Sequence, residues 1–239
     1  MPPSVPTPGT AASKLRIILT GATGMVGEGV LLECLANPAV AEVLVVSRKP
    51  YPLQHAKLKQ CLVPDFFDLD ALTRDLAGYD ACLFCAGVSS LGMSEPDYTR
   101  VTYDMTLHFA QTLAGLNPQM TFVYVSGAQT DSSEKGRVMW ARVKGRTENE
   151  LLRVGFAHVY NFRPGFMKPT AGQRNILSYY KYIGWLYPLL HVVMPNQVST
   201  LREVAVAMIQ CVLDGYPKSI LEVSDIKAMA KSASESAAA

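Results

Sequence analysis

The chain has 239 residues, of which 49% are hydrophobic and 18% charged, so it is long enough and apolar enough to bury a sizeable core. Its 22 Lys and Arg residues exceed its 20 Asp and Glu residues by only two, and it contains no basic run with interleaved aromatic residues. We therefore do not expect nucleic acid as a partner, because no extended basic surface would follow a phosphate backbone.

The two ends of the chain lack the apolar patterns that build a core. Residues 1–14 are rich in Pro, Ser and Thr and have no apolar stretch like that of a secretory signal, so we predict a disordered leader. Residues 226–239 finish in KSASESAAA, and we predict a disordered tail. Five cysteines without a secretory signal indicate a reducing compartment, and we expect a cytoplasmic protein.

Short apolar runs alternate with longer stretches of helical spacing. The runs are LRIIL from Leu15, EVLVV from Glu42, ACLFC from Ala81, TFVYV from Thr121 and HVYNF from His158. Each run is continuous, which is typical of a strand covered by helices on both faces. Helices are expected over about 24–37, 95–116 and 138–153. The alternation predicts an α/β protein with a doubly wound parallel sheet, a Rossmann fold, in a single domain over 15–225 with a small C-terminal substrate lobe from about residue 164.

A glycine-rich turn joins the first predicted strand to the first predicted helix. Its residues are Gly21, Ala22, Thr23, Gly24, Met25, Val26 and Gly27. Gly21 permits the tight turn, Gly24 lets backbone N–H groups approach a pyrophosphate, and Gly27 lets the helix pack against the sheet. The helix N-terminus then faces the negative charge of the ligand. An ordinary strand-to-helix turn is the alternative, but the position after the first strand favours a dinucleotide site.

The end of the second predicted strand indicates which dinucleotide binds. Proteins that bind NAD place an Asp or Glu there to hold the ribose 2′-hydroxyl group, whereas this chain has Ser47, Arg48 and Lys49. A hydroxyl group and two cations suit a 2′-phosphate. We therefore predict NADP(H) as cofactor, with NAD(H) as second choice; the alternative is a solvated basic turn before Pro50.

The cysteines and histidines do not form a recognisable metal site. Cys82 and Cys85 form a C-x-x-C motif, but within a strand their side chains point to opposite faces, so we interpret them as core thiols. The four histidines have no ligand spacing, and no metal site is predicted.

Together these motifs resemble the short-chain dehydrogenase/reductase superfamily, in its atypical and extended branches near the NmrA-like, Tat-interacting-protein-like and NAD-dependent epimerase-like groups. The resemblance extends from about residue 15 to residue 225. It rests on GATGMVG, on SRK at 47–49, and on later positions: Asp65-Phe66, Cys85-Ala86-Gly87, Ser126, Lys144 and Arg163-Pro164-Gly165. It implies that further cofactor contacts come from Asp65, Phe66, Cys85, Ala86, Gly87, Pro164 and Gly165.

The chain departs from the family at the catalytic position. Family members that reduce a carbonyl group or oxidise an alcohol normally carry Tyr-x-x-x-Lys, which places both side chains on one helix face. In those members the Lys holds the nicotinamide ribose and lowers the pKa of the phenol. Here Lys144 is present, but Trp140 occupies the position of the Tyr. An indole group donates a hydrogen bond and does not ionise. The family's substrate-holding Ser corresponds to Ser126, although Gly127 is an equally possible alignment.

Two functions remain open at this stage, and a third, a membrane-associated scaffold, depends only on the segment 176–195 and ranks well behind them. One is an NADP(H)-dependent oxidoreductase-like or epimerase-like enzyme that acts on a small molecule, with Lys144, Ser126 and Trp140 as catalytic residues. The other is an NADPH-sensing module that binds a protein partner without turnover. The aromatic segment 176–195 contains Lys181, His191 and Pro188, so we interpret it as a pocket wall or packing face and expect no membrane span. The substrate and the oligomeric state stay open.

Overall fold

The computed structural model describes residues 14–176 and 187–238. Seven strands form the central sheet: β1 (Leu15–Thr20), β2 (Val40–Ser47), β3 (Leu58–Leu62), β4 (Ala81–Phe84), β5 (Thr121–Val125), β6 (His158–Arg163) and β9 (Ile220–Glu222). Their order is β3-β2-β1-β4-β5-β6-β9, and every neighbouring pair is parallel. This arrangement confirms the predicted doubly wound parallel sheet.

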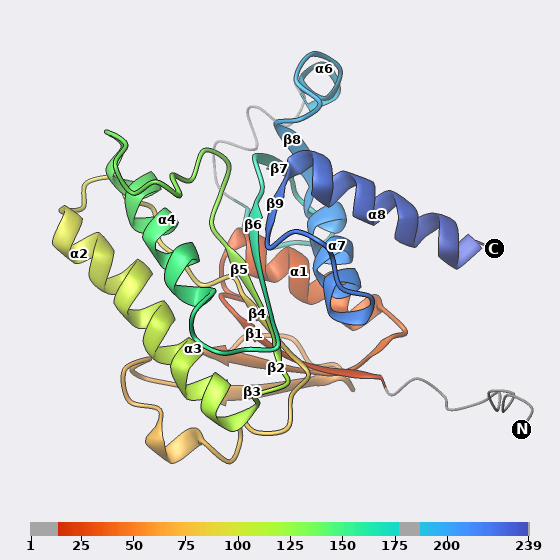
Figure 1. Ribbon diagram of the computed structural model, residues 1–239. Coiled ribbons are helices and arrows are strands. Elements are labelled where there is room, and N and C mark those ends of the chain that lie inside the picture. Colours follow the sequence, from red (N-terminus) through yellow and green to blue (C-terminus); the bar gives the residue numbers. More distant parts are fainter. Residues whose placement is uncertain (1–13, 177–186, 239) are drawn as a thin grey trace, which may run out of the picture.

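Helices cover both faces of this sheet, as Figure 1 shows. The helices on one face are α1 (Met25–Ala36), α7 (Leu201–Leu213) and α8 (Val223–Ala238). The other face carries α2 (Glu95–Thr99), the π-helical turn η2 (Arg100–Asp104), α3 (Met105–Leu116) and α4 (Met139–Leu151). A 3-10 turn, η1 (Asp70–Leu72), precedes β4. Two apolar clusters, one on each face, explain why the predicted strands are apolar without alternation.

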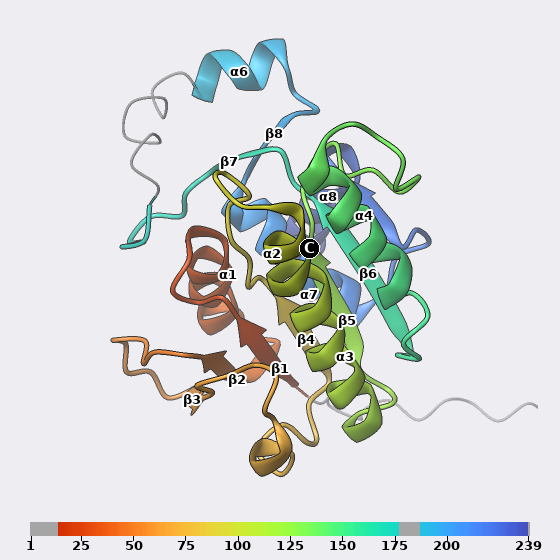
Figure 2. The ribbon, with the colours of Figure 1, turned by 90° about the vertical axis from the view of Figure 1, so that its left-hand side faces the viewer.

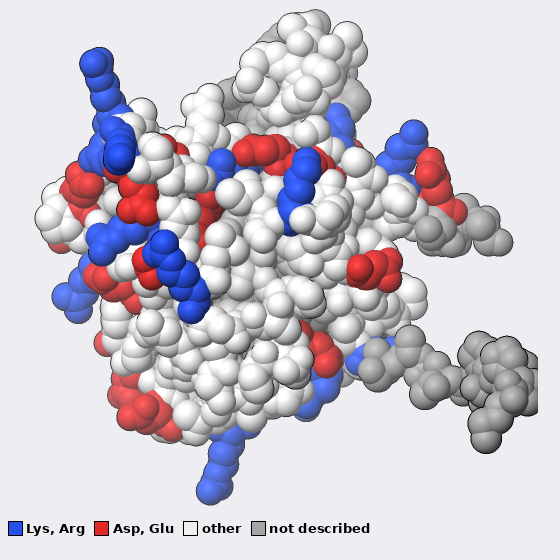
Figure 3. Space-filling view, in the orientation of Figure 1, with Lys and Arg blue, Asp and Glu red and all other residues white. Residues whose placement is uncertain are grey.

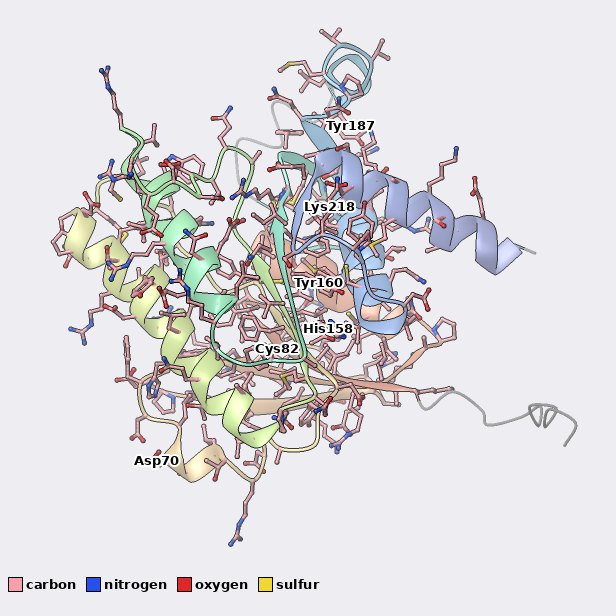
Figure 4. All side chains as sticks on the ribbon, viewed as in Figure 1. Asp70, Cys82, His158, Tyr160, Tyr187 and Lys218 are labelled. Carbon is pink, nitrogen blue, oxygen red and sulfur yellow. The ribbon has the colours of Figure 1, made fainter. Side chains whose placement is uncertain are left out.

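A small lobe follows the sixth strand of the sheet. It contains the parallel pair β7 (Phe166–Lys168) and β8 (Val198–Thr200), and the helix α6 (Tyr187–Val193). Figures 1 and 2 show α6 projecting beyond the other helices, and in Figure 4 Tyr187 lies at this projection while Cys82 lies within the sheet. Of the aromatic segment 176–195, residues 177–186 lie outside the described residues.

The prediction of a disordered tail from residue 226 is wrong for residues 226–238. These residues belong to α8, whose Ile226, Met229 and Ala230 side chains are buried against the core. The spacing of these three residues places them on one helix face, which packs on α7. The predicted leader, residues 1–14, lies outside the described residues except for Lys14.

Candidate functional site

The glycine-rich turn leaves no room for side chains at two of its positions. Gly21 has φ of +74°, and a Cβ atom there would lie 2.5 Å from the carbonyl oxygen of Cys85. A Cβ atom on Gly27 would lie 2.2 Å from the carbonyl oxygen of Gly21. Near these glycines, the Ala86 amide donates to the Thr20 hydroxyl oxygen at 3.1 Å. The turn therefore brings the ends of β1 and β4 and the first turn of α1 into backbone contact.

The N-terminus of α1 has the backbone features of an anion site. Gly24 is the N-cap residue, with φ of −101° and ψ of 168°, and as a glycine it has no side chain that could cap the helix. The amides of Met25, Val26 and Gly27 have no acceptor within the helix, because they belong to its first turn. Thr23, beside them, is exposed. A pyrophosphate at this end would accept from these amides and meet the positive end of the helix dipole.

The end of β2 carries two unpaired cations. Arg48 and Lys49 are exposed, and the described residues place no carboxylate in an ion pair with either. Ser47 is buried, and its hydroxyl group donates to the Lys49 carbonyl oxygen at 2.6 Å. Ser47 thus shapes the turn, and the two cations face solvent beyond it.

The residues that follow β3 and β4 differ in their exposure to solvent. Asp65 is exposed, and its carboxylate accepts from the Phe67 amide at 3.0 Å. The Phe66 side chain is buried against Phe109, with ring centroids 5.5 Å apart, so its ring belongs to the core. Gly87 is exposed, whereas Cys85 and Ala86 are partly buried, and burial raises the pKa of the Cys85 thiol group.

Cys82 and Cys85 are both free thiols on opposite sides of the sheet. Cys82 belongs to the cluster under α3, and Cys85 packs against the cluster under α1. Within the described part of the chain, no group of three or more His, Cys, Asp or Glu residues could hold a metal ion. No helix among the described residues is both long and apolar enough to cross a membrane.

Lys144 lies at the carboxyl end of β5. Its ammonium group donates to the carbonyl oxygen of Ser126, the residue that follows the strand. Burial lowers the pKa of Lys144 to about 8, against the opposing effect of Glu148. The Ser126 side chain is buried, and its hydroxyl group donates to the Phe162 carbonyl oxygen at 3.0 Å. Lys144 thus contacts the backbone carbonyl group of Ser126 and not its side chain. The hydroxyl proton of Ser126 is already donated to Phe162.

Trp140 lies one helical turn before Lys144 and is partly exposed. It lines a cavity of about 380 Å³ formed with the loop that joins β5 to α4. The other lining residues are Gln129, Asp131, Gly136, Arg137, Val138 and Ala141. Gln129 has φ of +68°, a left-handed conformation that is uncommon outside glycine. The Asp131 amide donates to the Ala141 carbonyl oxygen at 3.0 Å, which holds this loop against α4.

A buried ion pair supports the end of β6. Glu148 is fully buried, and its carboxylate accepts from the Arg163 guanidinium at 3.0 and 2.5 Å. Arg163 also donates to the Ser132 hydroxyl oxygen at 2.5 Å and to Glu222 at 3.2 Å. It therefore joins α4, the β5–α4 loop and the end of β9.

Pro164 and Gly165 follow this ion pair directly. The Pro164 carbonyl oxygen accepts from the Ala128 amide at 2.9 Å, and a Cβ atom on Gly165 would lie 2.1 Å from the Gln197 carbonyl oxygen. Backbone packing therefore fixes the position of Pro164 and Gly165 beside the loop that follows β5. The sequence motif alone does not reveal this packing.

The fold and the turn define a class: an NAD(P)-binding Rossmann protein of the short-chain dehydrogenase/reductase type. A sequence model of the NAD dependent epimerase/dehydratase family matches residues 17–136. The chain belongs to this family, as the resemblance predicted. The family match covers the glycine-rich turn, the end of β2 and the ends of β3 and β4.

Curated relatives come from fungi. "Protein fmp52, mitochondrial" of Aspergillus clavatus is 31% identical over 168 residues, which are 67% of this chain and 68% of that protein. "Leucinostatins biosynthesis cluster protein T" of Purpureocillium lilacinum is 28% identical over 144 residues, 59% of this chain and 52% of that protein, so the chain matches about half of its length. Several relatives have names that call them mitochondrial, which contradicts the expected cytoplasmic location. That prediction is therefore wrong. That expectation rested on five cysteines without a secretory signal, which do not distinguish these compartments.

Solved structures share the architecture. The Bordetella bronchiseptica enzyme WbmF in complex with NAD+ superposes with a TM-score of 0.65 at 15% sequence identity, over 95% of this chain and 79% of that one. At this identity the similarity establishes the fold and does not determine whether this chain prefers NAD or NADP.

Proposed function

We propose that the chain binds NADP(H), with NAD(H) as second choice, and acts as an oxidoreductase-like or epimerase-like enzyme on a small-molecule substrate. The observation that carries this proposal is the Lys144 ammonium group at the carboxyl end of β5, bonded to the Ser126 carbonyl oxygen. Ligands of open α/β sheets bind at this edge. Lys144 is therefore suitably placed to donate to the nicotinamide ribose.

The preference for NADP(H) rests on Arg48 and Lys49. A carboxylate at the end of β2 would repel a 2′-phosphate, whereas two unpaired cations attract it. The neutral ribose 2′-hydroxyl group of NAD(H) gains no such attraction. The first turn of α1 would hold the pyrophosphate of either cofactor, so this part of the site supports binding without deciding between them.

The proton-transfer step requires a group other than residue 140. Trp140 cannot ionise, so it cannot act as the acid or base that the family's Tyr provides. The Ser126 hydroxyl oxygen can still accept a hydrogen bond from a substrate although its proton is engaged. Water, a serine or a group of the substrate itself would then carry the proton.

A second candidate function is an NADPH-sensing module that binds a protein partner without turnover. The engaged donor of Ser126, together with the indole of Trp140, favours this candidate, because the Tyr position has lost its ionisable group and the Ser126 proton is already donated to the backbone. The retained cofactor features are equally compatible with it.

The experiment that separates these functions measures binding and turnover on the same protein. Calorimetry with NADPH and NADH tests binding, and near-ultraviolet absorbance then follows NADPH oxidation in the presence of small aldehydes, ketones and quinones. We expect oxidation in the native protein and its loss in Lys144→Ala but not in Lys135→Ala, an exposed control on the preceding loop. Binding without oxidation would rule out oxidoreductase activity on these carbonyl compounds and leave an epimerase-like activity or the sensing module, and no binding of either cofactor would overturn both functions.

We also propose a mitochondrial location, on the basis of the relatives' names. Fluorescence microscopy of the tagged full chain beside a mitochondrial marker tests it. A diffuse signal that does not overlap the marker would contradict the proposal.

A further inference from the structure

The loop that follows β7, residues 169–175, crosses α1 near the cofactor end of that helix. Figure 2 shows the chain after β7 passing beside α1. The Gln173 side-chain amide donates to the Met25 carbonyl oxygen at 2.7 Å, and its carbonyl oxygen accepts from the Thr170 amide at 2.6 Å. This crossing loop is therefore fastened to the first turn of α1, where the pyrophosphate would bind.

A buried carboxylate fixes the backbone of the crossing loop at Arg174. Glu28 of α1 is fully buried, and one of its oxygens accepts from the backbone amides of Arg174 at 3.0 Å and Asn175 at 2.6 Å. Hydrogen bonds to an ionised acceptor are about twice as strong as neutral ones. The carboxylate therefore specifies where the Arg174 side chain begins.

The same carboxylate fixes the turn that carries Arg48 and Lys49. The second oxygen of Glu28 accepts from the Tyr51 hydroxyl group at 2.7 Å. Burial, together with Glu28, raises the pKa of Tyr51 to about 12, so the phenol keeps its proton at neutral pH and remains a donor. Glu28 thus holds two segments that are far apart in the sequence against each other.

The Arg174 side chain reaches this turn. Its guanidinium group donates to the Pro52 carbonyl oxygen at 3.5 Å. Arg174 is exposed, and no carboxylate among the described residues forms an ion pair with it. A guanidinium has five N–H donors, so most of them stay available to an anion.

We infer that Arg174 is a third cation of the 2′-phosphate site and a determinant of the preference for NADPH over NADH. The inference rests on the proposed use of NADP(H), and it adds a residue that lies outside the local sequence motif. Arg48 and Lys49 approach the phosphate from the end of β2, and Arg174 approaches it from the crossing loop. Glu28 is a positioning residue, because it acts only through the backbone of Arg174 and the hydroxyl group of Tyr51.

The test compares NADPH and NADH binding by calorimetry in the native protein and in Arg174→Ala. Loss of one charge-assisted contact should weaken NADPH binding by roughly tenfold, equivalent to about 1.4 kcal/mol. NADH binding should change by less than about twofold, because NADH has no 2′-phosphate to lose the contact. Arg202→Ala is the matched control, since Arg202 is an exposed arginine that lines a cavity together with Pro169 and Thr170 of the same loop.

Two results would overturn the inference while leaving the cofactor preference in place. In one, Arg174→Ala keeps the full preference for NADPH that Arg48→Ala loses. In the other, Arg174→Ala weakens both cofactors equally, which indicates a structural role. A native protein that binds both cofactors equally would instead refute the proposed preference itself, together with the role of Arg174 in it. Arg174→Lys provides a further readout, because it keeps the charge and should retain part of the preference.

Discussion

Replacing Gly27 with alanine would place a methyl group 2.2 Å from the Gly21 carbonyl oxygen and 2.9 Å from the Ala22 amide nitrogen. Both neighbours are backbone atoms of the turn, so neither can move aside as a flexible side chain could. The helix α1 would have to shift away from β1. Gly24→Ala is the matched control, because the nearest atom to its Cβ position is the Gly21 carbonyl oxygen at 3.4 Å.

The size of each effect follows from these distances. Overpacking costs about 1–3 kcal/mol, and the backbone overlap at Gly27 places this substitution at the upper end. Removing a glycine from a helix returns about 1 kcal/mol, which leaves a net loss of roughly 2 kcal/mol. For a chain of this size that lowers the melting temperature by roughly 4–8 °C. Gly24→Ala should change stability by less than about 0.5 kcal/mol, because the conformation of Gly24 suits any residue.

The two variants should rank in opposite order for stability and for cofactor binding. Gly27→Ala should lose more stability, and Gly24→Ala should lose more affinity for the cofactor. The methyl group of Gly24→Ala would stand where the backbone must approach the pyrophosphate, so we expect at least roughly tenfold weaker NADPH binding at nearly native stability. Thermal unfolding followed by circular dichroism measures the stability, and calorimetry measures the binding. Equal melting temperatures for Gly27→Ala and the native protein would refute the packing argument. Native affinity in Gly24→Ala would refute the assigned place of the pyrophosphate.

Arg163→Met should lower the free energy of unfolding by about 3–5 kcal/mol in urea, because it leaves Glu148 buried without its partner. The double variant Arg163→Met with Glu148→Leu should recover most of that loss, and a loss as large as in the single variant would contradict this reasoning. Because burial lowers the pKa of Lys144 to about 8, the fold disfavours its ammonium form, so the cofactor-free protein should gain stability as the pH rises from about 8 towards 10.5. Lys144→Met should remove this gain in urea titrations across that pH range. Ile226→Ala should cost about 2–5 kcal/mol, since Ile226 is fully buried; a change within about 0.5 kcal/mol would argue for the tail that the sequence suggested.

The sheet could be predicted where the sequence carries a continuous apolar run. The five apolar runs correspond to β1, β2, β4, β5 and β6, because strands buried on both faces must be apolar throughout. The strands β7, β8 and β9 have only three residues each, too few to stand out as an apolar run. The helix α8 was missed because its Ala-rich and Ser-rich composition resembles disorder, although the spacing of Ile226, Met229 and Ala230 is helical.

The candidate site contains local contacts, which could be predicted from the sequence, and contacts between distant residues, which could not. The glycine-rich turn is contained in seven consecutive residues, so its geometry could be read from the sequence. Glu28 contacts Arg174 and Asn175 across 146 and 147 positions, and no local pattern indicates such a pairing. A glutamate among the apolar residues of a helix was the available signal, since a buried carboxylate requires donors.

The contact that positions Lys144 does not depend on the side chain at position 140. Lys144 is held by a backbone carbonyl group, that of Ser126, so replacing a phenol with the indole of Trp140 does not release it. Under the proposed function we therefore expect substitutions at position 140 to leave Lys144 in place.

The cavity beside Trp140 contains only two ionisable side chains among the described residues, Asp131 and Arg137. A guanidinium does not give up its proton. Hydrogen bonds from Ser133 and Gly136 lower the pKa of Asp131, which keeps this carboxylate ionised and already occupied as an acceptor. Neither side chain is suited to replace the missing phenol. If the protein performs chemistry, this favours a proton carried by water or by the substrate over one carried by a side chain of that cavity.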